Sequence, residues 1–393
     1  QENTVQAAAS KVTILLDGYP LPFPVEPVVK SGTTMVPFRA ISEALGIQVE
    51  WNQTAKRITA SKKNAIGKKV VILTNGSRNA VVNGETVKLT IAPLSIRGTT
   101  MIPLSFFSGQ FGATVSWNQS TNTVSIISPK KDMYTLGFYA LSSFDQYSLL
   151  PDFDAIAFGW SRIDRNGEFT LKGDEYKMPQ PADDITPEFI VSDAAAQGTS
   201  PYLMVYSVDG KSELTKNLED KELQERTISG IVNTATQKGF EGIILDLEGL
   251  GLSGDIAKAR SDYNSFVQNL SSKTRKAGLK LSIVLHPLNS SYSGYDYKTL
   301  GSLADDLIIM AYAYGDEKSP EPVDKVDEAI RLALQQTTKG KLILGISLAS
   351  ENEKSVNTKI GLAKRYDLKG IAIWRLGIID QPVWNQMNKS VEM

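Results

Sequence analysis

Two acidic residues, Asp246 and Glu248, stand at the end of an apolar stretch of the chain. Residues 239–249 read Gly-Phe-Glu-Gly-Ile-Ile-Leu-Asp-Leu-Glu-Gly. Such a nearly continuous apolar run is typical of a strand that is covered on both faces. The two acids are two positions apart and so point to the same side of the strand, where burying them is costly unless they serve a purpose. This pattern predicts a pair of reactive carboxyl groups. The alternative is a surface strand end with two solvated acids, and the apolar run argues against it.

The elements that would position these acids alternate regularly through residues 133–393. This stretch of about 260 residues is near the usual size of a (β/α)8 barrel. Strand-like and helical segments follow one another, as a parallel barrel requires. The predicted fold class is therefore α/β, a TIM barrel. Its eight predicted strands are 135–139, 155–160, 202–207, 242–247, 280–285, 306–311, 341–347 and 370–374.

Two of the intervening segments predict long helices. Residues 221–238 follow Asp220, a residue that can cap a helix N-terminus, and end before Gly239. Residues 255–277 carry apolar side chains at helical spacing and end before Gly278.

The residues at the carboxyl ends of the predicted strands should converge on one end of the barrel. Aromatic side chains would then surround the two acids. Sugar rings have apolar faces and polar edges, so aromatic platforms with hydrogen-bonding groups suit a saccharide. Taken singly, each aromatic is more often a core residue than a ligand contact, and a lone histidine is more often structural than sugar-binding. The residues expected at this rim are Tyr139, Trp160, Tyr206, His286, Tyr312, Tyr314 and Trp374.

Residues 1–128 contain an internal duplication. The hexapeptide Gly-Thr-Thr-Met-Val-Pro at 32–37 recurs as Gly-Thr-Thr-Met-Ile-Pro at 98–103, an offset of 66 residues. The same offset relates the Trp-Asn-Gln tripeptides at 51–53 and 117–119. Several matches at one offset indicate a repeated structural unit.

Local signals predict a small α+β fold for each repeat. Pro37 suits the first turn of a short helix, and Gly46 suits the left-handed position that ends it. The Asn-Gly pairs at 75–76 and 83–84 predict two-residue hairpins. The tryptophans of the two repeats are expected to lie in their cores.

Composition and charge restrict the kind of protein. Hydrophobic residues make up 41% of the 393, which allows a sizeable core. The 42 Lys and Arg against 43 Asp and Glu leave a net charge of -1, which argues against a nucleic-acid partner. The chain has no cysteine and one histidine, so we expect no disulfide, no metal and no cofactor. No apolar run approaches the ~20 residues that a membrane span needs.

The start of the chain suggests export. It begins at Gln1 without a methionine, and three alanines stand at 7–9. These features predict a mature form that has lost a signal peptide. An arbitrary chain boundary is the alternative.

Residues 241–248 resemble the Asp-Gly-x-Asp-x-Asp-x-Glu signature of glycoside hydrolase family 18, the chitinase-like group. Glu248 matches the family's proton donor, and Asp246 matches the aspartate that orients the substrate's acetamido group. The first two aspartates are replaced, by Glu241 and Ile244. Within the family the chain is most similar to bacterial cell-wall and spore-germination N-acetylglucosaminidases, which also relax the middle aspartate.

Two further segments share the resemblance. Residues 306–313 resemble the family's sixth strand, which ends in Met-x-Tyr-Asp, with Ala313 in place of the aspartate. Residues 371–374 resemble the eighth strand, whose tryptophan floors the subsite beside the cleaved bond. The resemblance together with the aromatic rim names as substrate-binding residues Trp374, Tyr139, Trp160, Tyr206 and Met310.

The resemblance implies substrate-assisted hydrolysis with retention. Glu248, kept protonated by apolar surroundings, would donate a proton to the glycosidic oxygen and later activate water. The substrate's N-acetyl carbonyl would attack the anomeric carbon while Asp246 holds the acetamido N–H and Tyr312 bonds the same group. Because Ile244 cannot share a proton with Asp246, we expect Asp246 to stay ionised.

Residues 10–127 resemble the two-repeat stalk domain named after the N-terminal domain of copper amine oxidases. This region has no histidine and no cysteine, the ligands that copper prefers, so the name does not imply copper here. The resemblance implies a non-catalytic role as spacer, wall-adhesion module or partner of the barrel. The alternative is a packing domain without a ligand.

These features together predict a glycoside hydrolase that cleaves β-linked glycans containing N-acetylglucosamine. The expected substrate is peptidoglycan of the bacterial cell wall or spore cortex, and chitin or its oligosaccharides are the alternative. A different class remains open, a non-catalytic glycan-binding wall scaffold, which the substitutions Ile244 and Ala313 favour and the retained acids and aromatics oppose. The expected location is secreted or cell-wall associated in a Gram-positive-type bacterium, with the spore as one setting.

Overall fold

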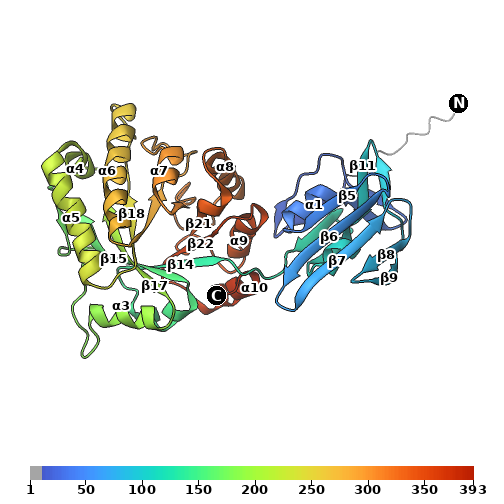
Figure 1. The fold of residues 1–393 in the computed structure, drawn as a ribbon, viewed down its shortest axis with the longest axis horizontal. Coiled ribbons are helices and arrows are strands. Elements are labelled where there is room, and N and C mark those ends of the chain that lie inside the picture. Colours follow the sequence, from blue (N-terminus) through green and yellow to red (C-terminus); the bar gives the residue numbers. More distant parts are fainter. Residues whose placement is uncertain (1–10) are drawn as a thin grey trace. The chain divides into compact units, whose positions relative to one another are not determined.

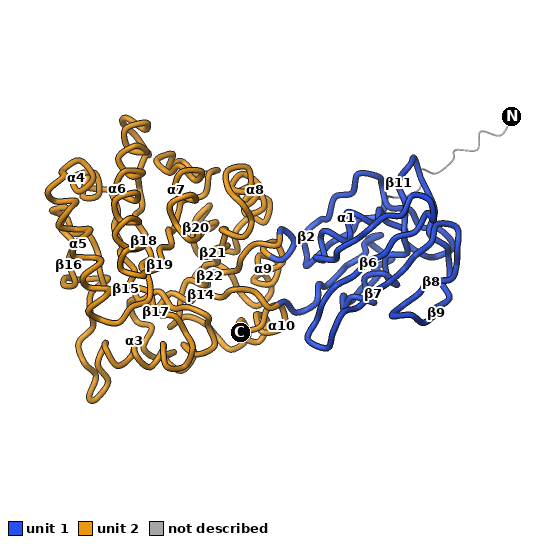
Figure 2. The backbone as a smooth tube through the Cα atoms, in the orientation of Figure 1, with its two compact units in different colours: residues 1–131, 364–366 blue, residues 132–363, 367–393 orange. Residues whose placement is uncertain are grey.

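The computed structural model describes residues 11–393, and these form two compact units (Figure 1). The first unit comprises the chain up to residue 131 together with 364–366, and the second comprises 132–363 and 367–393 (Figure 2). The export features expected at Gln1 and at residues 7–9 lie outside the described residues.

The first unit consists of strands and two short helices. Its elements are β1 (Thr13–Leu16), β2 (Tyr19–Pro20), β3 (Val28–Lys30), β4 (Thr33–Pro37), α1 (Phe38–Ala44), β5 (Gln48–Asn52), β6 (Arg57–Asn64), β7 (Gly67–Thr74), β8 (Asn79–Val82), β9 (Glu85–Lys88), β10 (Leu94–Ile96), β11 (Thr99–Pro103), α2 (Leu104–Gln110), β12 (Thr114–Asn118) and β13 (Thr123–Ile127). The strands form three sheets, ordered β12-β13-β1-β2, β10-β11-β4-β3 and β5-β6-β7-β8-β9. The pairing of β4 with β11 joins equivalent strands of the two repeats.

Most local signals in this unit give the structure expected of them. Gly46 takes a φ of +65° directly after α1, and Asn83 and Gly84 take positive φ values in a two-residue turn between β8 and β9. Two expectations are wrong. Pro37 is the last residue of β4 and precedes the helix instead of opening its first turn. The pair at 75–76 lies in a four-residue connection, because β8 begins only at Asn79.

The two tryptophans of the repeats differ in burial. Trp51 is half-buried and packs against the core, with its ring 6.1 Å from that of Phe38. Trp117 is 48% exposed, so the expectation that it lies in a core is wrong. Both tryptophans lie on edge strands, but the second repeat has Leu104 at the position equivalent to Phe38. Trp117 therefore lacks the aromatic face that covers Trp51.

The second unit is a closed parallel barrel. Its elements are β14 (Tyr134–Tyr139), η1 (Phe144–Asp152), β15 (Ala155–Ile163), β16 (Phe169–Thr170), α3 (Pro187–Ala196), β17 (Ser200–Ser207), α4 (Glu213–Glu219), α5 (Lys221–Gln237), β18 (Gly242–Leu247), α6 (Ile256–Lys276), β19 (Lys280–Leu285), α7 (Tyr297–Leu303), β20 (Asp306–Ile309), α8 (Val323–Leu334), η2 (Lys339–Lys341), β21 (Leu342–Ser347), α9 (Val356–Arg365), β22 (Gly370–Trp374) and α10 (Gln381–Ser390). The strand order is β14-β22-β21-β20-β19-β18-β17-β15, closed by pairing of β14 with β15, and β16 adds an antiparallel strand to β15. The predicted TIM barrel is confirmed.

The barrel interior is filled by side chains from alternate positions of the strands. This is how an eight-stranded parallel barrel closes over a packed core. Ile244 is completely buried there, at the position where the family signature has its middle aspartate. The interior cluster comprises Leu136, Phe138, Ala140, Ala155, Ala157, Tyr176, Tyr202, Met204, Ile244, Val284, Ile308, Met310, Ile343 and Ala372.

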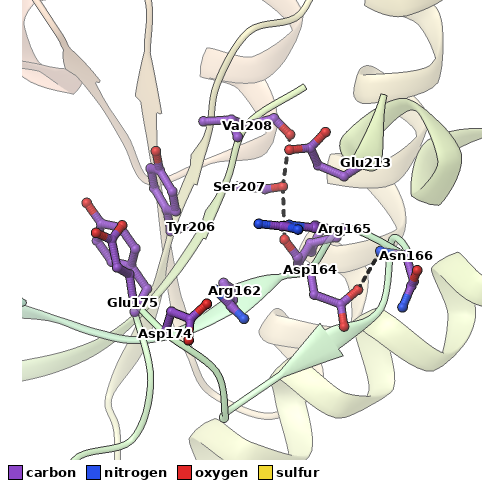
Figure 3. A pocket seen from close by; sticks show the side chains of 12 residues that line it. Arg162, Asp164, Arg165, Asn166, Asp174, Glu175, Tyr206, Ser207, Val208 and Glu213 are labelled. Carbon is purple, nitrogen blue, oxygen red and sulfur yellow. Dashed lines mark hydrogen bonds between the residues drawn. The ribbon is translucent and has the colours of Figure 1, made fainter. Parts of the chain in front are cut away.

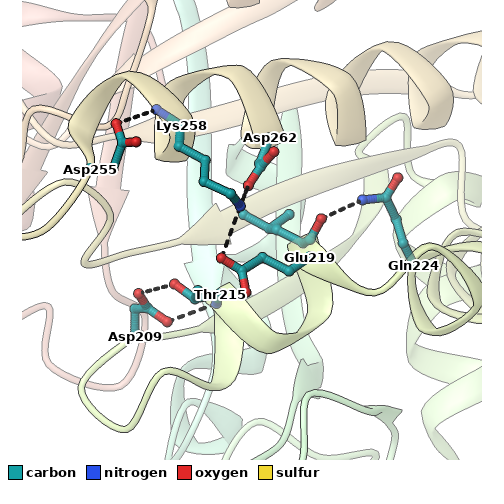
Figure 4. Close-up of polar contacts among 8 residues, drawn as sticks. Asp209, Thr215, Glu219, Gln224, Asp255, Lys258 and Asp262 are labelled. Atoms are coloured by element: carbon teal, nitrogen blue, oxygen red, sulfur yellow. Dashed lines mark hydrogen bonds and ion pairs between the residues drawn. The ribbon is translucent and has the colours of Figure 1, made fainter.

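Helices surround the barrel, and the two long ones begin at acidic caps. The side chains of Asp220 and Asp255 accept hydrogen bonds from the first turns of α5 and α6, so Asp255 caps its helix from just outside. The ammonium group of Lys258 on α6 lies 2.9 Å from Glu219 at the end of α4 and 2.7 Å from Asp262 (Figure 4). These exposed pairs contribute little stability. No helix within residues 11–393 is long and apolar enough to cross a membrane.

Candidate active site

Strand β18 delivers the two acids to one end of the barrel. Asp246 is the fifth residue of the strand, and Glu248 follows its last residue. The side chain of Asp246 is 4% exposed, and Glu248 is half-buried. Among the described residues no donor reaches the buried Oδ1 of Asp246. This atom can therefore accept a hydrogen bond from a ligand.

The burial of the two carboxyl groups controls their protonation. Burial raises the pKa of Glu248, and the nearby charge of Glu317 adds to this effect. Burial and the charge of Glu248 raise the pKa of Asp246 well above its ordinary value. The pair therefore holds a proton under conditions in which free carboxyl groups are ionised. The charge of Glu248 acts on Asp246 in place of the aspartate that Ile244 replaces, and the expectation that Asp246 stays ionised remains a prediction.

Tyr312 lies beside the two acids, three residues after the end of β20. Burial raises the pKa of its hydroxyl well above the ordinary value, and the charges of Asp246 and Glu248 raise it further. Tyr312 is therefore a phenol that can donate a hydrogen bond. Gly345 on β21 gives its ring room, because a Cβ at that position would lie 3.2 Å from Cε1 of the tyrosine. Met310 is 7% exposed and belongs to the barrel interior.

A glutamate that the sequence did not point to holds the backbone directly after Tyr312. The carboxylate of Glu321 accepts hydrogen bonds from the N–H groups of Ala313, at 2.9 Å, and Tyr314, at 3.1 Å. Ala313 has a φ of +63°, a left-handed conformation that is uncommon for a residue other than glycine. Glu321 is 5% exposed. No local pattern marks this residue, because it lies in an irregular connection eight positions after the backbone that it contacts.

Two of the predicted aromatics lie at the mouth of the barrel. Tyr206 pairs in register with Asp246 on the neighbouring strand, so its side chain points to the same side. Its ring stacks on that of Tyr176, with centroids 4.0 Å apart. Trp374 ends β22, is half-buried, and has its ring 5.4 Å from that of Phe138. A role for both residues in binding substrate stays a prediction.

Tyr176 is a residue of this mouth that sequence reasoning missed. It comes from the irregular segment between β16 and α3 and has a φ of +49°. Its side chain nevertheless packs into the interior cluster. The close approach depends on Gly159, where a Cβ would lie 3.2 Å from Cδ1 of the tyrosine. A tyrosine in a long loop carries no sequence signal for such a position.

The structure does not bring Tyr139 and Trp160 to the acids. Each alternates with a neighbour that faces the interior, so each points away from it. Their rings pack instead around Phe158, at 5.3 Å and 4.6 Å between centroids. They line a separate, mainly apolar hollow of about 480 Å³. A role for these two residues in binding substrate stays a prediction, and it concerns that hollow.

A second hollow, of about 430 Å³, borders the stacked tyrosines and is lined by several charged side chains (Figure 3). Its walls carry arginines and acids from the end of β15 and the following turn, together with Glu213. Residues 174–176 line this hollow and the apolar one, so Tyr176 separates the two. Together the hollows extend the accessible surface on both sides of the barrel mouth.

The backbone that follows Glu248 is held by the connection after β19. The N–H of Gly249 donates to Nε2 of His286 at 3.1 Å. Burial lowers the pKa of His286 to about 4, so its imidazole is neutral and able to accept this bond. Gly249 has a φ of +92°, and a Cβ there would lie 3.1 Å from the backbone nitrogen of Asp209. The carboxylate of Asp209 is in turn fixed by the N–H and hydroxyl of Thr215 (Figure 4).

Side chains suited to metal binding do not converge in the described part of the chain. Within residues 11–393 no group of three or more His, Asp or Glu residues could hold a metal ion. The chemistry available at the barrel mouth is that of a carboxyl pair, a phenol donor and aromatic faces.

Comparisons with known proteins agree with this architecture. Residues 15–126 match the copper amine oxidase N-terminal domain, and residues 116–351 match glycosyl hydrolases family 18. The cortical fragment-lytic enzyme of Bacillus anthracis is 30% identical over 174 residues, which cover 40% of this chain and 39% of that protein. The enzyme of the same name from Bacillus subtilis is 28% identical over 141 residues, 33% of this chain and 32% of that protein. The chain thus spans about two fifths or less of these relatives.

Solved structures show the same fold. The spore cortex-lytic enzyme SleL of Bacillus cereus superposes with a TM-score of 0.54 at 19% identity, over 67% of this chain and 75% of that one. A chitinase from Chromobacterium violaceum superposes with a TM-score of 0.55 at 20% identity, over 65% of this chain and 98% of that one. Both resemblances found in the sequence are thus confirmed.

Proposed function

We propose that this chain, which belongs to glycosyl hydrolase family 18, hydrolyses a β-linked glycan that contains N-acetylglucosamine. The observation that carries the proposal is the pair of Asp246 and Glu248 at the carboxyl end of β18 in a closed barrel. The pKa of each carboxyl group is raised by burial. A carboxyl group that keeps its proton near the working pH is suited to general acid catalysis.

The roles we propose are those that the family resemblance implies, and the positions of the groups support them. The acetamido N–H of the bound sugar donates to Asp246, which favours the ionised form of that residue and moves the shared proton to Glu248. Glu248 gives this proton to the glycosidic oxygen as the C–O bond breaks, and the acetamido carbonyl oxygen closes on the anomeric carbon. Tyr312 donates a hydrogen bond to the acetamido group, and ionised Asp246 balances the positive charge of the oxazolinium ring. Glu248 then takes a proton from the water that opens the ring, so the configuration is retained.

The substrate we propose is peptidoglycan, with the spore cortex as its source. The support is the name of the curated relatives, cortical fragment-lytic enzymes of Bacillus species. The aromatic faces of Trp374 and Tyr206 suit the sugar rings of such a glycan. The location proposed is accordingly outside the cytoplasm, in or on the wall of a spore-forming bacterium. The duplicated unit is proposed to hold the enzyme on that wall.

A direct test compares three substrates. The protein is incubated with purified spore-cortex peptidoglycan, vegetative-cell peptidoglycan and chitin oligosaccharides, and the new reducing ends are identified by mass spectrometry, with Glu248→Gln as control. Cleavage after N-acetylglucosamine in peptidoglycan, absent in the variant, is the expected result. Cleavage of chitin oligosaccharides alone would overturn the substrate. Sedimentation with the glycans but no new reducing end from any of them would overturn the enzymatic role and identify a binding protein.

A further inference from the structure

The five residues 247–251, called here the Glu248 loop, connect the acid to the rest of the barrel. On one side the N–H of Glu248 donates to the carbonyl oxygen of Ser207, at the end of β17, at 2.9 Å. On the other side the loop contacts residues 286–296, the connection between β19 and α7. The position of the Glu248 carboxyl group therefore depends on how these neighbours hold the backbone.

Tyr295 holds the loop on both sides of the acid. Its hydroxyl donates to the carbonyl oxygen of Leu247 at 2.6 Å and accepts from the N–H of Leu250 at 3.2 Å. The side chain is 3% exposed, and burial raises the pKa of its hydroxyl well above the ordinary value. The phenol therefore keeps its proton at neutral pH and can donate this bond. One oxygen atom fixes the residue before Glu248 and the second residue after it.

His286 holds the residue directly after the acid. The N–H of Gly249 can donate to Nε2 only if that nitrogen carries no proton, so the imidazole proton must be on Nδ1. The ring lies stacked on Tyr292, with centroids 4.0 Å apart, and tilted against Tyr295 at 5.4 Å. This packing fixes the plane of the ring and so the direction of its acceptor.

Two backbone contacts complete the attachment. The N–H of Gly294 donates to the carbonyl oxygen of Leu250 at 3.2 Å, and that of Ser293 donates to Gly251 at 3.3 Å. A Cβ at residue 251 would lie 2.2 Å from the nitrogen of Gly294. The two segments can therefore approach this closely only because both positions are glycine. The Glu248 loop consequently has no room to shift without breaking several contacts at once.

We propose that His286 and Tyr295 are positioning residues, which hold the Glu248 loop so that the acid meets the glycosidic oxygen. The inference rests on the proposed function for its kinetic part only. In this proposal neither side chain contacts the substrate. Their effect passes through the backbone at Leu247, Gly249 and Leu250, on both sides of the acid. A misplacement of about 1 Å in a catalytic group can cost roughly 10²-fold in rate.

The alternative is that the two side chains satisfy buried backbone groups and contribute stability alone. The two readings differ in what a substitution changes. If the role is purely structural, a substitution lowers the unfolding midpoint and leaves the kcat of the folded fraction unchanged. A positioning role lowers kcat in protein that is still folded, and it leaves KM nearly unchanged because the sugar contacts remain.

The first experiment needs no substrate. His286 is the single histidine of the chain, so the full-length protein labelled with ¹⁵N-histidine gives one imidazole spin system. At neutral pH we expect the tautomer with the proton on Nδ1, and a Gly249 amide that is protected from hydrogen exchange. A proton on Nε2, or a rapidly exchanging Gly249 amide, would overturn the proposal whatever the protein cleaves.

The second experiment is kinetic and uses the glycan that the protein is found to cleave. We expect His286→Leu and Tyr295→Phe to lower kcat by roughly 10–100-fold with little change in KM. His286→Gln, which offers an amide oxygen as acceptor, should recover most of the lost rate and the protection of the Gly249 amide. Tyr147→Phe is the matched control, because it removes a tyrosine hydroxyl that donates to Asp193 elsewhere in the barrel.

The outcomes are separable. Equal kcat in His286→Leu and the unchanged protein, or a loss in Tyr147→Phe as large as in Tyr295→Phe, would overturn the positioning role. No recovery in His286→Gln would overturn the acceptor role of the imidazole. A protein that cleaves no glycan but shows the expected tautomer and protected amide would contradict the proposed function, while the attachment of the loop would stand.

Discussion

A buried ion pair lies behind the loop that carries Tyr312. The ammonium group of Lys359, on α9, is 2.6 Å from a carboxylate oxygen of Glu351, and the two side chains are 4% and 1% exposed. The other oxygen of Glu351 accepts the backbone N–H of Glu321 at 3.3 Å. Since Glu321 in turn holds the two residues that directly follow Tyr312, the pair supports this part of the candidate site as well as the fold. We expect Lys359→Met to destabilise the barrel strongly.

The expected magnitude follows from the burial of the pair. Removing one partner leaves the carboxylate of Glu351 charged and almost without solvent, which costs about 3–5 kcal/mol. For a unit of this size, roughly 1 kcal/mol shifts the melting temperature by about 2–4 °C, so a fall of about 6–20 °C is expected. The double variant Lys359→Met with Glu351→Leu removes the unpaired charge. It should recover most of the loss, because apolar replacement of a whole buried pair is often close to neutral.

A matched control is available on the surface of the same barrel. Lys339 and Asp367 lie 2.7 Å apart, nearly the same separation, but their side chains are 58% and 50% exposed. Lys339→Met should therefore cost no more than about 1 kcal/mol. The assay is thermal and urea unfolding of the full-length chain, followed by far-ultraviolet circular dichroism.

Equal destabilisation by Lys359→Met and Lys339→Met would refute the argument from burial. A double variant as unstable as the single one would show that the loss comes from packing and not from the unpaired charge. The link to the site has its own readout. Glu321→Gln replaces one oxygen with an amide donor, which cannot accept both backbone N–H groups, and we expect lower kcat from a displaced Tyr312 at nearly unchanged unfolding midpoint.

Three further predictions concern the acid and its loop. Glu248→Gln keeps shape but cannot donate a proton, so the cleavage rate should fall by about 10²–10⁴-fold while affinity for a thiazoline analogue of the sugar, measured by calorimetry, changes little. Gly249→Ala should lower both kcat and stability, because alanine is strained at a φ of +92° and its Cβ would lie 3.1 Å from the backbone nitrogen of Asp209. A variant that is both active and stable would contradict the need for glycine at this position. The pKa of His286 is lowered from 6.5 to about 4, so its contribution to stability is complete above pH 6.5 and is lost as the pH falls toward 4. This loss amounts to about 3 kcal/mol, measured by urea unfolding, and His286→Gln should not show it.

The barrel strands could be predicted because each is a short apolar run that only a strand covered on both faces explains. Strand β18 begins and ends as expected, at residues 242 and 247. The ends of other strands differ from the predicted ends by a few residues. β20 stops at Ile309, two residues before the predicted end, and β15 continues to Ile163. Such ends depend on hydrogen bonds to neighbouring strands, which the sequence of one strand does not contain.

The aromatic rim was predicted only in part, and the reason is strand alternation. Every aromatic at a strand end was assigned to the barrel mouth, although side chains alternate between the two faces. Phe138 faces the interior, so Tyr139 cannot. At Trp160 the count is harder, because the register between β15 and β17 shifts between Phe158 and Ser161. The alternation of side chains along a strand could have corrected the assignment of Tyr139. The register shift that affects Trp160 has no sequence signal.

The loop contributions to the site were beyond sequence reasoning. Tyr176 and Glu321 lie in irregular connections, and their positions result from contacts with distant strands. Each contact depends on an inconspicuous feature, such as the space left by Gly159. In contrast, the acids could be found because burial of a carboxylate within an apolar strand is costly and therefore conspicuous.

The replacement of the family's middle aspartate by Ile244 has a physical consequence for the acid pair. Ile244 lies on the same side of β18 as Asp246, one step deeper in the barrel, and it is completely buried. A carboxyl group there would have to share a proton with Asp246 to avoid a buried charge. With isoleucine in that place, the pKa of Asp246 is raised by burial and by Glu248 alone. A proton held by Asp246 can therefore pass to one neighbouring carboxyl group only. That group is Glu248, the proposed proton donor. Under the proposed mechanism, the substitution therefore removes a competitor for the proton that Glu248 would donate.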